Sequence, residues 1–254
     1  MVALVFLAVG WVGPAHAQVP LDAEPGSSVR TRQDLGELLD LYEQVLLSPV
    51  YSDGVKEATR VRANRIRDRL TNGDFRLGDR VVLSVQGEPE LPDTIPVQAG
   101  PMISLPLFGD IPLNGVLRSE IADHIIEAMR QYLREPVVRA EGLMRISVQG
   151  SVGRPGFYVV PADMLLSETL MMAGGPSGTA DLEGLRIERG PELVMGGEEL
   201  QELLRRGDTL DQLNLQAGDQ IVLPERGAGG FFTNIGVIVG IVTSLTVLIL
   251  QLSR

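Results

Sequence analysis

The stretch ISVQGSVGRPGFYVV, residues 146–160, decides how the second half of the chain folds. Apolar and polar side chains alternate at its start, which is the pattern of a half-buried β-strand. Its middle, from Gly150 to Gly156, is rich in glycine and proline and is typical of a turn. We therefore predict strands at 146–148 and 157–160 on the two sides of this turn.

Short elements separated by turn residues continue to residue 226. We expect helices at 165–173 and 198–206 and strands at 185–189 and 221–223. Gly174 and Gly175 end the first of these helices, because glycine adopts the left-handed conformation readily. The predicted order β-β-α-β-α-β is typical of a small β-grasp-like module.

An α+β unit is predicted upstream of this module. Its expected elements are strands at 80–85, 103–107 and 111–113, a proline-rich connection at 88–96, an amphipathic helix at 117–133 and an extended segment at 136–139. The seven residues from Leu77 to Leu83 parallel those from Ala217 to Leu223, and each set contains a Gly-Asp pair. We interpret Asp79 and Asp219 as turn or cap residues.

Two amphipathic helices are predicted before this unit, at 32–47 and 53–70. The second helix carries a basic run made up of Arg60, Arg62, Arg65, Arg67 and Arg69. Because the rest of the chain shows no compensating basic character, we interpret this run as a solvated helix face and not as a nucleic-acid surface.

The composition excludes several classes of function. The formal net charge of −11 disfavours binding to nucleic acid, since phosphate backbones repel an acidic chain. The chain has no cysteine and two histidines, so thiolate chemistry and histidine metal sites are not expected, and no cofactor is predicted. Asp110 with Glu120, or Glu88 with Glu90, would suit a glycosidase, but among 33 acidic residues such pairs arise by chance. We do not expect an enzyme.

Both ends of the chain are apolar. The run from Val2 to Gly13, followed by Ala15-His16-Ala17, predicts a secretory signal peptide cleaved before Gln18; a buried N-terminal strand is the alternative. At the other end, residues 231–252 would form a helix of about 33 Å, enough to span a hydrocarbon core of about 30 Å.

The predicted C-terminal helix has a face of small and polar side chains. Its members are Thr233, Gly236, Gly240, Thr243, Ser244 and Gln251. Small residues at a spacing of four let helices approach closely in lipid. Three interpretations of this segment remain open. They are a single-pass anchor, a helix that packs against copies of itself around a pore, and a buried strand pair.

Three sets of motifs resemble the outer-membrane polysaccharide export family, the Wza-like translocons. The first is Leu77-Gly78-Asp79, Gly87-x-Pro89-Glu90-Leu91, Leu105-Pro106-x-x-Gly109 and Ile111-x-Leu113-x-Gly115. The second is Val148-x-Gly150-x-Val152-x-x-Pro155-Gly156-x-Tyr158 with Ala173-Gly174-Gly175, and it resembles an SLBB (soluble ligand-binding β-grasp) domain. The third is Ala217-Gly218-Asp219-x-Ile221-x-Leu223-Pro224. The chain departs from the family at Leu117, where a threonine usually opens the helix, and it lacks the lipidated cysteine.

Combined with the apolar ends and the two predicted helices, the resemblance predicts an α+β chain of five parts. These are a signal peptide at 1–17, a helical segment at 18–72, a polysaccharide export domain at 73–145, one SLBB domain at 146–226 and a transmembrane helix at 231–252. The implied location is the cell envelope, in the periplasm, with the C-terminal helix in the outer membrane.

The implied function is export of a capsular polysaccharide or exopolysaccharide across the outer membrane by an oligomeric, non-enzymatic translocon. The expected partners are further copies of the chain in a ring, the secreted polysaccharide, and an inner-membrane Wzc-like chain-length regulator coupled to a tyrosine kinase. The alternative is a membrane-anchored periplasmic glycan-binding or adaptor protein.

The candidate site residues form two sets. The turns expected near a ligand are Gly150, Arg154, Pro155, Gly156, Gly174, Gly175, Pro106 and Gly109. The expected helix-packing or pore face comprises Gly236, Gly240, Thr243, Ser244 and Gln251. The glycines at 150, 156, 174 and 175 are expected to shape turns with positive φ, and contact with sugar is the alternative role of these turns.

Overall fold

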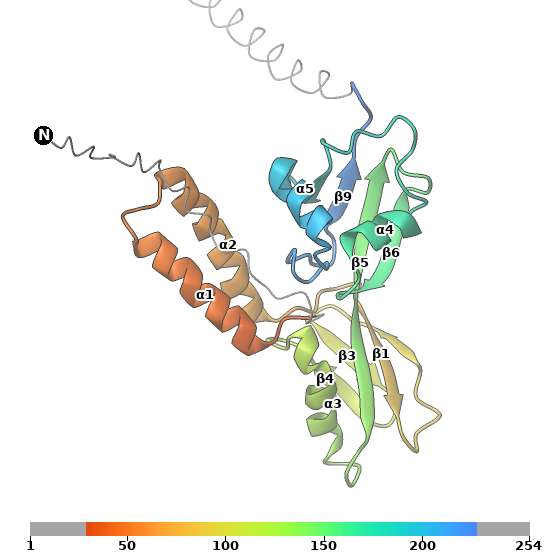
Figure 1. The fold of residues 1–254 in the computed structure, drawn as a ribbon. Helices are drawn as coiled ribbons and strands as arrows, with labels where there is room; N and C mark the ends of the chain where they lie inside the picture. The colour runs from red at the N-terminus through yellow and green to blue at the C-terminus, as the bar shows by residue number, and fades with distance from the viewer. Residues whose placement is uncertain (1–28, 228–254) are drawn as a thin grey trace, which may run out of the picture.

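The computed structural model describes residues 29–227. The predicted signal peptide at 1–17 and the predicted transmembrane helix at 231–252 lie outside these residues. Within 29–227, no helix combines the length and the apolar character that crossing a membrane requires. The described part of the chain is α+β, as predicted, with a helical hairpin beside a mixed sheet (Figure 1).

The helical hairpin is formed by α1 (Arg32–Leu47) and α2 (Asp53–Asn72). Thr31 begins α1 with a capping box, because its hydroxyl accepts from Asp34 N at 3.2 Å and the Asp34 carboxylate accepts from Thr31 N at 2.8 Å. Gly73 ends α2 at a φ of 74°. The helix predicted at 32–47 is confirmed, and α2 is two residues longer than predicted.

The export unit follows the hairpin and leads into a long strand. Its elements are β1 (Arg80–Val85), β2 (Thr94–Pro96), β3 (Met102–Leu105), β4 (Gly109–Pro112), the 3-10 helix η1 (Arg118–Glu120), α3 (Ile121–Met129) and β5 (Val138–Gly150). The helix predicted at 117–133 is wrong in extent, since residues 118–120 form the 3-10 helix η1 and α3 ends at Met129, where a turn over 130–132 follows. The helix could not have continued past Glu135, which has a φ of 54° and precedes Pro136. The strand β2 lies at the end of the proline-rich connection predicted at 88–96.

The SLBB unit begins within β5 and adds further strands and helices. These are β6 (Gly156–Pro161), α4 (Leu166–Met172), β7 (Arg186–Arg189), β8 (Glu192–Gly196), α5 (Gly197–Arg206) and β9 (Gln220–Leu223). The predicted elements are present, and β8 is an additional strand that pairs with β7. The order is therefore β-β-α-β-β-α-β and not the predicted β-β-α-β-α-β.

The strand β5 belongs to both units. Leu143 pairs with Arg80 of β1 and with Pro161 of β6, so β1 and β6 lie on opposite edges of β5. Val148 pairs with Gly156 of β6 and with Ile221 of β9, so β9 lies on the same edge as β1, further along the strand. The prediction of separate extended segments at 136–139 and 146–148 is wrong, and the boundary expected between 145 and 146 lies inside β5.

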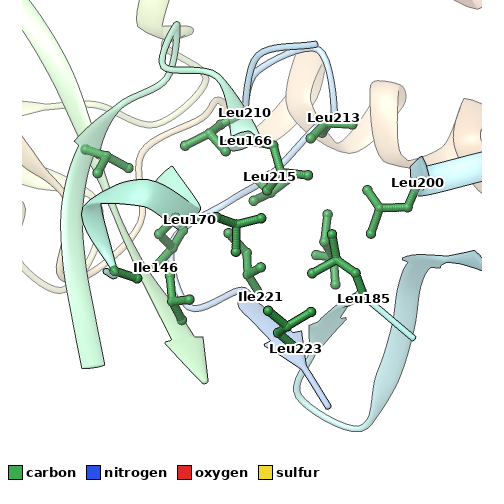
Figure 2. Packing of buried hydrophobic residues seen from close by; sticks show 14 of the residues in the cluster. Ile146, Leu166, Leu170, Leu185, Leu200, Leu210, Leu213, Leu215, Ile221 and Leu223 are labelled. Atoms are coloured by element: carbon green, nitrogen blue, oxygen red, sulfur yellow. The ribbon is translucent and has the colours of Figure 1, made fainter. Parts of the chain in front are cut away.

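Three apolar cores support these elements. In the SLBB core, leucines of α4 and α5 converge on the sheet, as Figure 2 shows for Leu166, Leu170 and Leu200 against Ile146 and Ile221. The core of the export unit packs α3 against β1 and the β3–β4 hairpin. The third core lies between α1 and α2.

The hairpin core includes Leu117, which is fully buried beside Leu35 and Ile66. Leu117 therefore connects the export unit with the hairpin. It has no hydroxyl to cap η1, but the Glu120 carboxylate accepts a hydrogen bond from Leu117 N at 3.0 Å. Where the family has a threonine that caps the helix, Leu117 instead provides apolar packing between the export unit and the hairpin.

A buried ion network joins the hairpin to both units. Arg69 of α2 is 2% exposed, and its guanidinium binds Asp74 through Nε (2.7 Å) and Nη2 (3.0 Å). The same Nη2 donates to Asp211 Oδ1 at 2.6 Å, and Asp211 lies in the SLBB unit, 142 residues away. Asp74 also accepts from Arg118 N at 3.0 Å. One guanidinium thus connects α2 with the start of the export unit and with the SLBB unit.

The arginine run on α2 is only partly solvated, which corrects the prediction. Arg62 pairs with Glu199 of α5, and Arg65 donates to the carbonyl of Val194 at 3.0 Å. The spacing of Arg62, Arg65 and Arg69 places them on one helix face, and that face lies against the SLBB unit. Arg60 and Arg67 remain on the exposed side.

The network keeps its charges despite burial. Burial disfavours the Asp74 carboxylate, but the cations of Arg69 and Arg118 outweigh this effect and lower the pKa of Asp74. Burial also disfavours the Arg69 cation, but Asp211 and Asp74 raise the pKa of Arg69 overall. A lowered folded-state pKa means that Asp74 stabilises the fold at neutral pH and loses this contribution as acid protonates it.

We predict that Arg69→Met destabilises the chain by about 3–5 kcal/mol, because it leaves two buried carboxylates without their cation. Urea unfolding of the full chain in mild detergent, followed by circular dichroism, measures the effect. The matched control is Arg67→Met, which removes an exposed pair with Glu43 and should cost about 0–1 kcal/mol. Equal losses in the two variants would contradict the role of Arg69.

Candidate functional site

The turn predicted at 150–156 and the end of α4 lie together. Gly153 N donates to the carbonyl of Gly175 at 3.0 Å, and Arg154 N donates to the carbonyl of Ala173 at 2.7 Å. Val152 forms an isolated bridge with Pro176. Six of the predicted turn residues therefore form one cluster, which we call the SLBB turn cluster: Gly150, Arg154, Pro155, Gly156, Gly174 and Gly175.

Three glycines of the SLBB turn cluster have the expected conformation. The φ angles of Gly150, Gly174 and Gly175 are 86°, 83° and 70°. A Cβ at Gly150 would overlap the carbonyl of Leu223, so this position requires glycine for space as well as for conformation. The prediction for Gly156 is wrong: it begins β6 without a positive φ, and a Cβ there would meet nothing within 4 Å.

The side chain of Arg154 caps the C-terminal end of α4. Its Nη2 donates to the carbonyl of Met172 at 2.9 Å, where α4 leaves carbonyl groups without helical partners. The Tyr158 hydroxyl donates to the carbonyl of Arg154. The observed contacts of Arg154 therefore hold the turn cluster together, and Pro155 lies exposed beside it.

Pro106 and Gly109 do not join this cluster. Pro106 lies in the turn between β3 and β4, in the export unit, and Gly109 is the first residue of β4, with a φ of 79°. The apolar side chain of Leu107 at this turn is 77% exposed, and Phe108 makes an edge-on contact with the Tyr132 ring. The pore-face residues from Gly236 to Gln251 lie outside the described residues.

The two Gly-Asp turns of the internal repeat have the same hydrogen bonds. Asp79 Oδ2 accepts from Arg76 N at 3.0 Å, and Asp219 Oδ2 accepts from Gln216 N at 2.9 Å. Each carboxylate also pairs with an arginine, Asp79 with Arg118 and Asp219 with Arg189. The interpretation of both aspartates as turn residues is confirmed.

Both Gly-Asp turns contact the same residue of β5. Arg145 N donates to Asp79 Oδ1 at 3.2 Å, and the carbonyl of Arg145 accepts from Gly218 N at 2.9 Å. The turns thus fill the edge of β5 between β1 and β9. The repeat in the sequence signalled two similar turns, but it did not indicate that they meet.

Glu120, a member of one candidate carboxylate pair, is held in an ion pair. Arg32 binds Glu120 at 2.7 and 2.8 Å, and this hydrogen bonding lowers the pKa of Glu120, whereas a general acid needs a raised pKa. Over residues 29–227, no cluster of three or more histidine, cysteine or acidic side chains is placed to hold a metal ion.

Comparison with known families gives two matches in succession. Residues 71–141 match the model described as polysaccharide biosynthesis/export protein, and residues 145–201 match the SLBB domain. Among curated proteins, no match to the chain was found. The two matched ranges meet inside β5, and the resemblance identified from the motifs is confirmed.

We predict that Gly150→Ala destabilises the fold by about 2 kcal/mol or more, since alanine adds left-handed strain and an overlap with Leu223. Gly156→Ala is the matched control, with an expected change within about 0.5 kcal/mol. Thermal unfolding of the two variants beside the parent chain measures the difference. Equal melting temperatures for the two variants would show that the turn at Gly150 tolerates a side chain.

Proposed function

We propose that this chain, which belongs to the polysaccharide biosynthesis/export family, is a non-enzymatic component of a translocon that carries a secreted polysaccharide across the outer membrane. The observation that supports the proposal is the succession of an export domain and an SLBB domain on one shared strand, β5. The signal peptide at 1–17 would direct the chain to the periplasm.

The transport route is proposed to be a ring of identical chains. A polar polymer cannot cross hydrocarbon, so protein or water must line its path. One helix has no lumen, so several copies of the helix at 231–252 would have to form the wall. The face of Gly236, Gly240, Thr243, Ser244 and Gln251 would contact neighbouring helices and water. A Wzc-like chain-length regulator in the inner membrane is the proposed partner that supplies the polymer.

Deletion of the gene tests the proposed function. We expect loss of extracellular polysaccharide and its recovery when the parent gene is restored. In mild detergent, light scattering should give a protein mass that is a multiple of one chain. Normal polysaccharide secretion after deletion would refute the export role, and the mass of a single chain would favour the adaptor alternative.

The variant Gly240→Leu tests the wall of the ring. It should still insert into the membrane but should lose the ring and export, because leucine keeps helices apart. Ile241→Leu is the control, one position along and close in volume, and should export normally. Normal export by Gly240→Leu from an intact ring would show that the helix is only an anchor.

A further inference from the structure

One face of β5 is covered by cores, and most side chains of the other face are exposed, although Leu143 is half-buried and Ser147 is buried there. The even-numbered side chains, such as Val138, Met144 and Val148, lie in the two cores with α3, α4 and α5. In Figure 1, α3 and α5 lie on the same side of β5. The odd-numbered side chains of Arg139, Glu141, Arg145 and Gln149 are exposed.

Neighbouring strands extend this open face. Strand pairing places Arg80 of β1 beside Leu143, and it places Phe157 of β6 and Gln220 of β9 on the two sides of Ser147. Paired residues project from the same face of a sheet. We call the surface made by Arg80, Arg139, Arg145, Gln149, Phe157 and Gln220 the open β5 face.

The open β5 face carries cations that the fold does not neutralise. Within residues 29–227, no carboxylate forms an ion pair with Arg80, Arg139 or Arg145. Glu141 is the acidic side chain that β5 places among them. In a chain with a net charge of −11, this excess of arginine points to an acidic ligand.

The same face offers hydrogen-bonding groups and an aromatic ring. Gln149 Nε2 donates to Gln220 Oε1 at 3.1 Å, an arrangement that leaves Gln149 Oε1 to accept and Gln220 Nε2 to donate. Phe157 is 68% exposed, with the Arg145 guanidinium 4.1 Å from its ring centroid. In an acidic sugar chain, the amides can bind the hydroxyl groups, the guanidinium groups can bind the carboxylates, and the aromatic ring can contact the apolar face of a sugar ring.

We infer that the open β5 face binds an extended glycan that carries carboxylate groups. Arginine binds carboxylates through two parallel hydrogen bonds, and the amide pair binds sugar hydroxyls. From residue 139 to residue 149 the strand extends over about 33 Å, at about 3.3 Å per residue, so a ligand of several sugar units fits. A lipid surface fits poorly, because the apolar side chains of Leu143, Val159 and Val222 on this face are only partly exposed. Phe157 is the large apolar side chain that stands exposed beside them. The inference rests on the proposed function, since it names the class of polymer.

Binding of alginate oligosaccharides, which consist of uronic acids, tests the inference. The full chain in mild detergent is titrated with alginate and with neutral dextran oligosaccharides of equal length. We expect binding to alginate that weakens as salt is added, and no binding to dextran. The double variant Arg139→Gln, Arg145→Gln should raise the Kd for alginate about tenfold or more.

The matched control is the double variant Arg60→Gln, Arg205→Gln. It removes two exposed arginines from outside the open β5 face and changes the net charge equally. Its Kd should stay within about twofold of the parent value, because these arginines lie away from the ligand. Circular dichroism and light scattering should show that both double variants keep the parent fold and mass.

Several results would overturn the inference. In the titration, they are absence of alginate binding, equal binding of dextran, or an equal rise in the Kd for alginate in both double variants. In light scattering, a changed oligomeric mass of the Arg139, Arg145 variant would show that the face is a contact between copies of the chain. The proposed function fails separately. If gene deletion abolishes secretion and alginate does not bind, only the inference is wrong; if alginate binds and deletion leaves secretion intact, only the export role is wrong.

Discussion

The structure depends on the burial of one cation. Arg69 is removed from water, and a guanidinium in that position is stable only when carboxylates surround it. Asp74 lies at the start of the export unit, where it also binds Arg118 N, and Asp211 lies in the SLBB unit. The ion pairs of Arg69 therefore form only when the hairpin and both units are in place together. The packing of Leu117 against the hairpin core reinforces this arrangement. The helical hairpin is therefore an integral part of the body that the two domains form.

The second organising feature is the shared strand β5. Because the Gly-Asp turns meet at Arg145, β1 and β9 run away from that residue in opposite directions on one edge of β5. This arrangement makes one sheet from two domains and leaves one face of it uncovered. A surface that crosses the domain boundary is well suited to a long polymer, whereas a pocket within either domain would hold only a short part of it.

Local patterns predicted much of the fold. The helix at 32–47 and the strand at 80–85 were located correctly, because their apolar spacing is regular and their ends carry capping or turn residues. The continuity of β5 was not predicted, because Gly142 interrupts the alternation of apolar and polar side chains. The lack of a side chain at Gly142 makes room for the Phe75 ring. The burial of Arg69 depends on a partner 142 residues away, and the capping role of Arg154 depends on the end of α4. Neither contact leaves a local signal in the sequence.

Native-state hydrogen exchange tests the central claim most directly, which is that Arg69 joins the hairpin and both domains into one cooperative body. We predict that the most protected amides of α2, β1 and β9 exchange with one common free energy of opening. We also predict that Asp211→Asn lowers this free energy equally for all three elements. The account would be contradicted if the amides of α2 exchanged with a much smaller free energy while β1 and β9 stayed protected, because the hairpin would then open independently of the sheet.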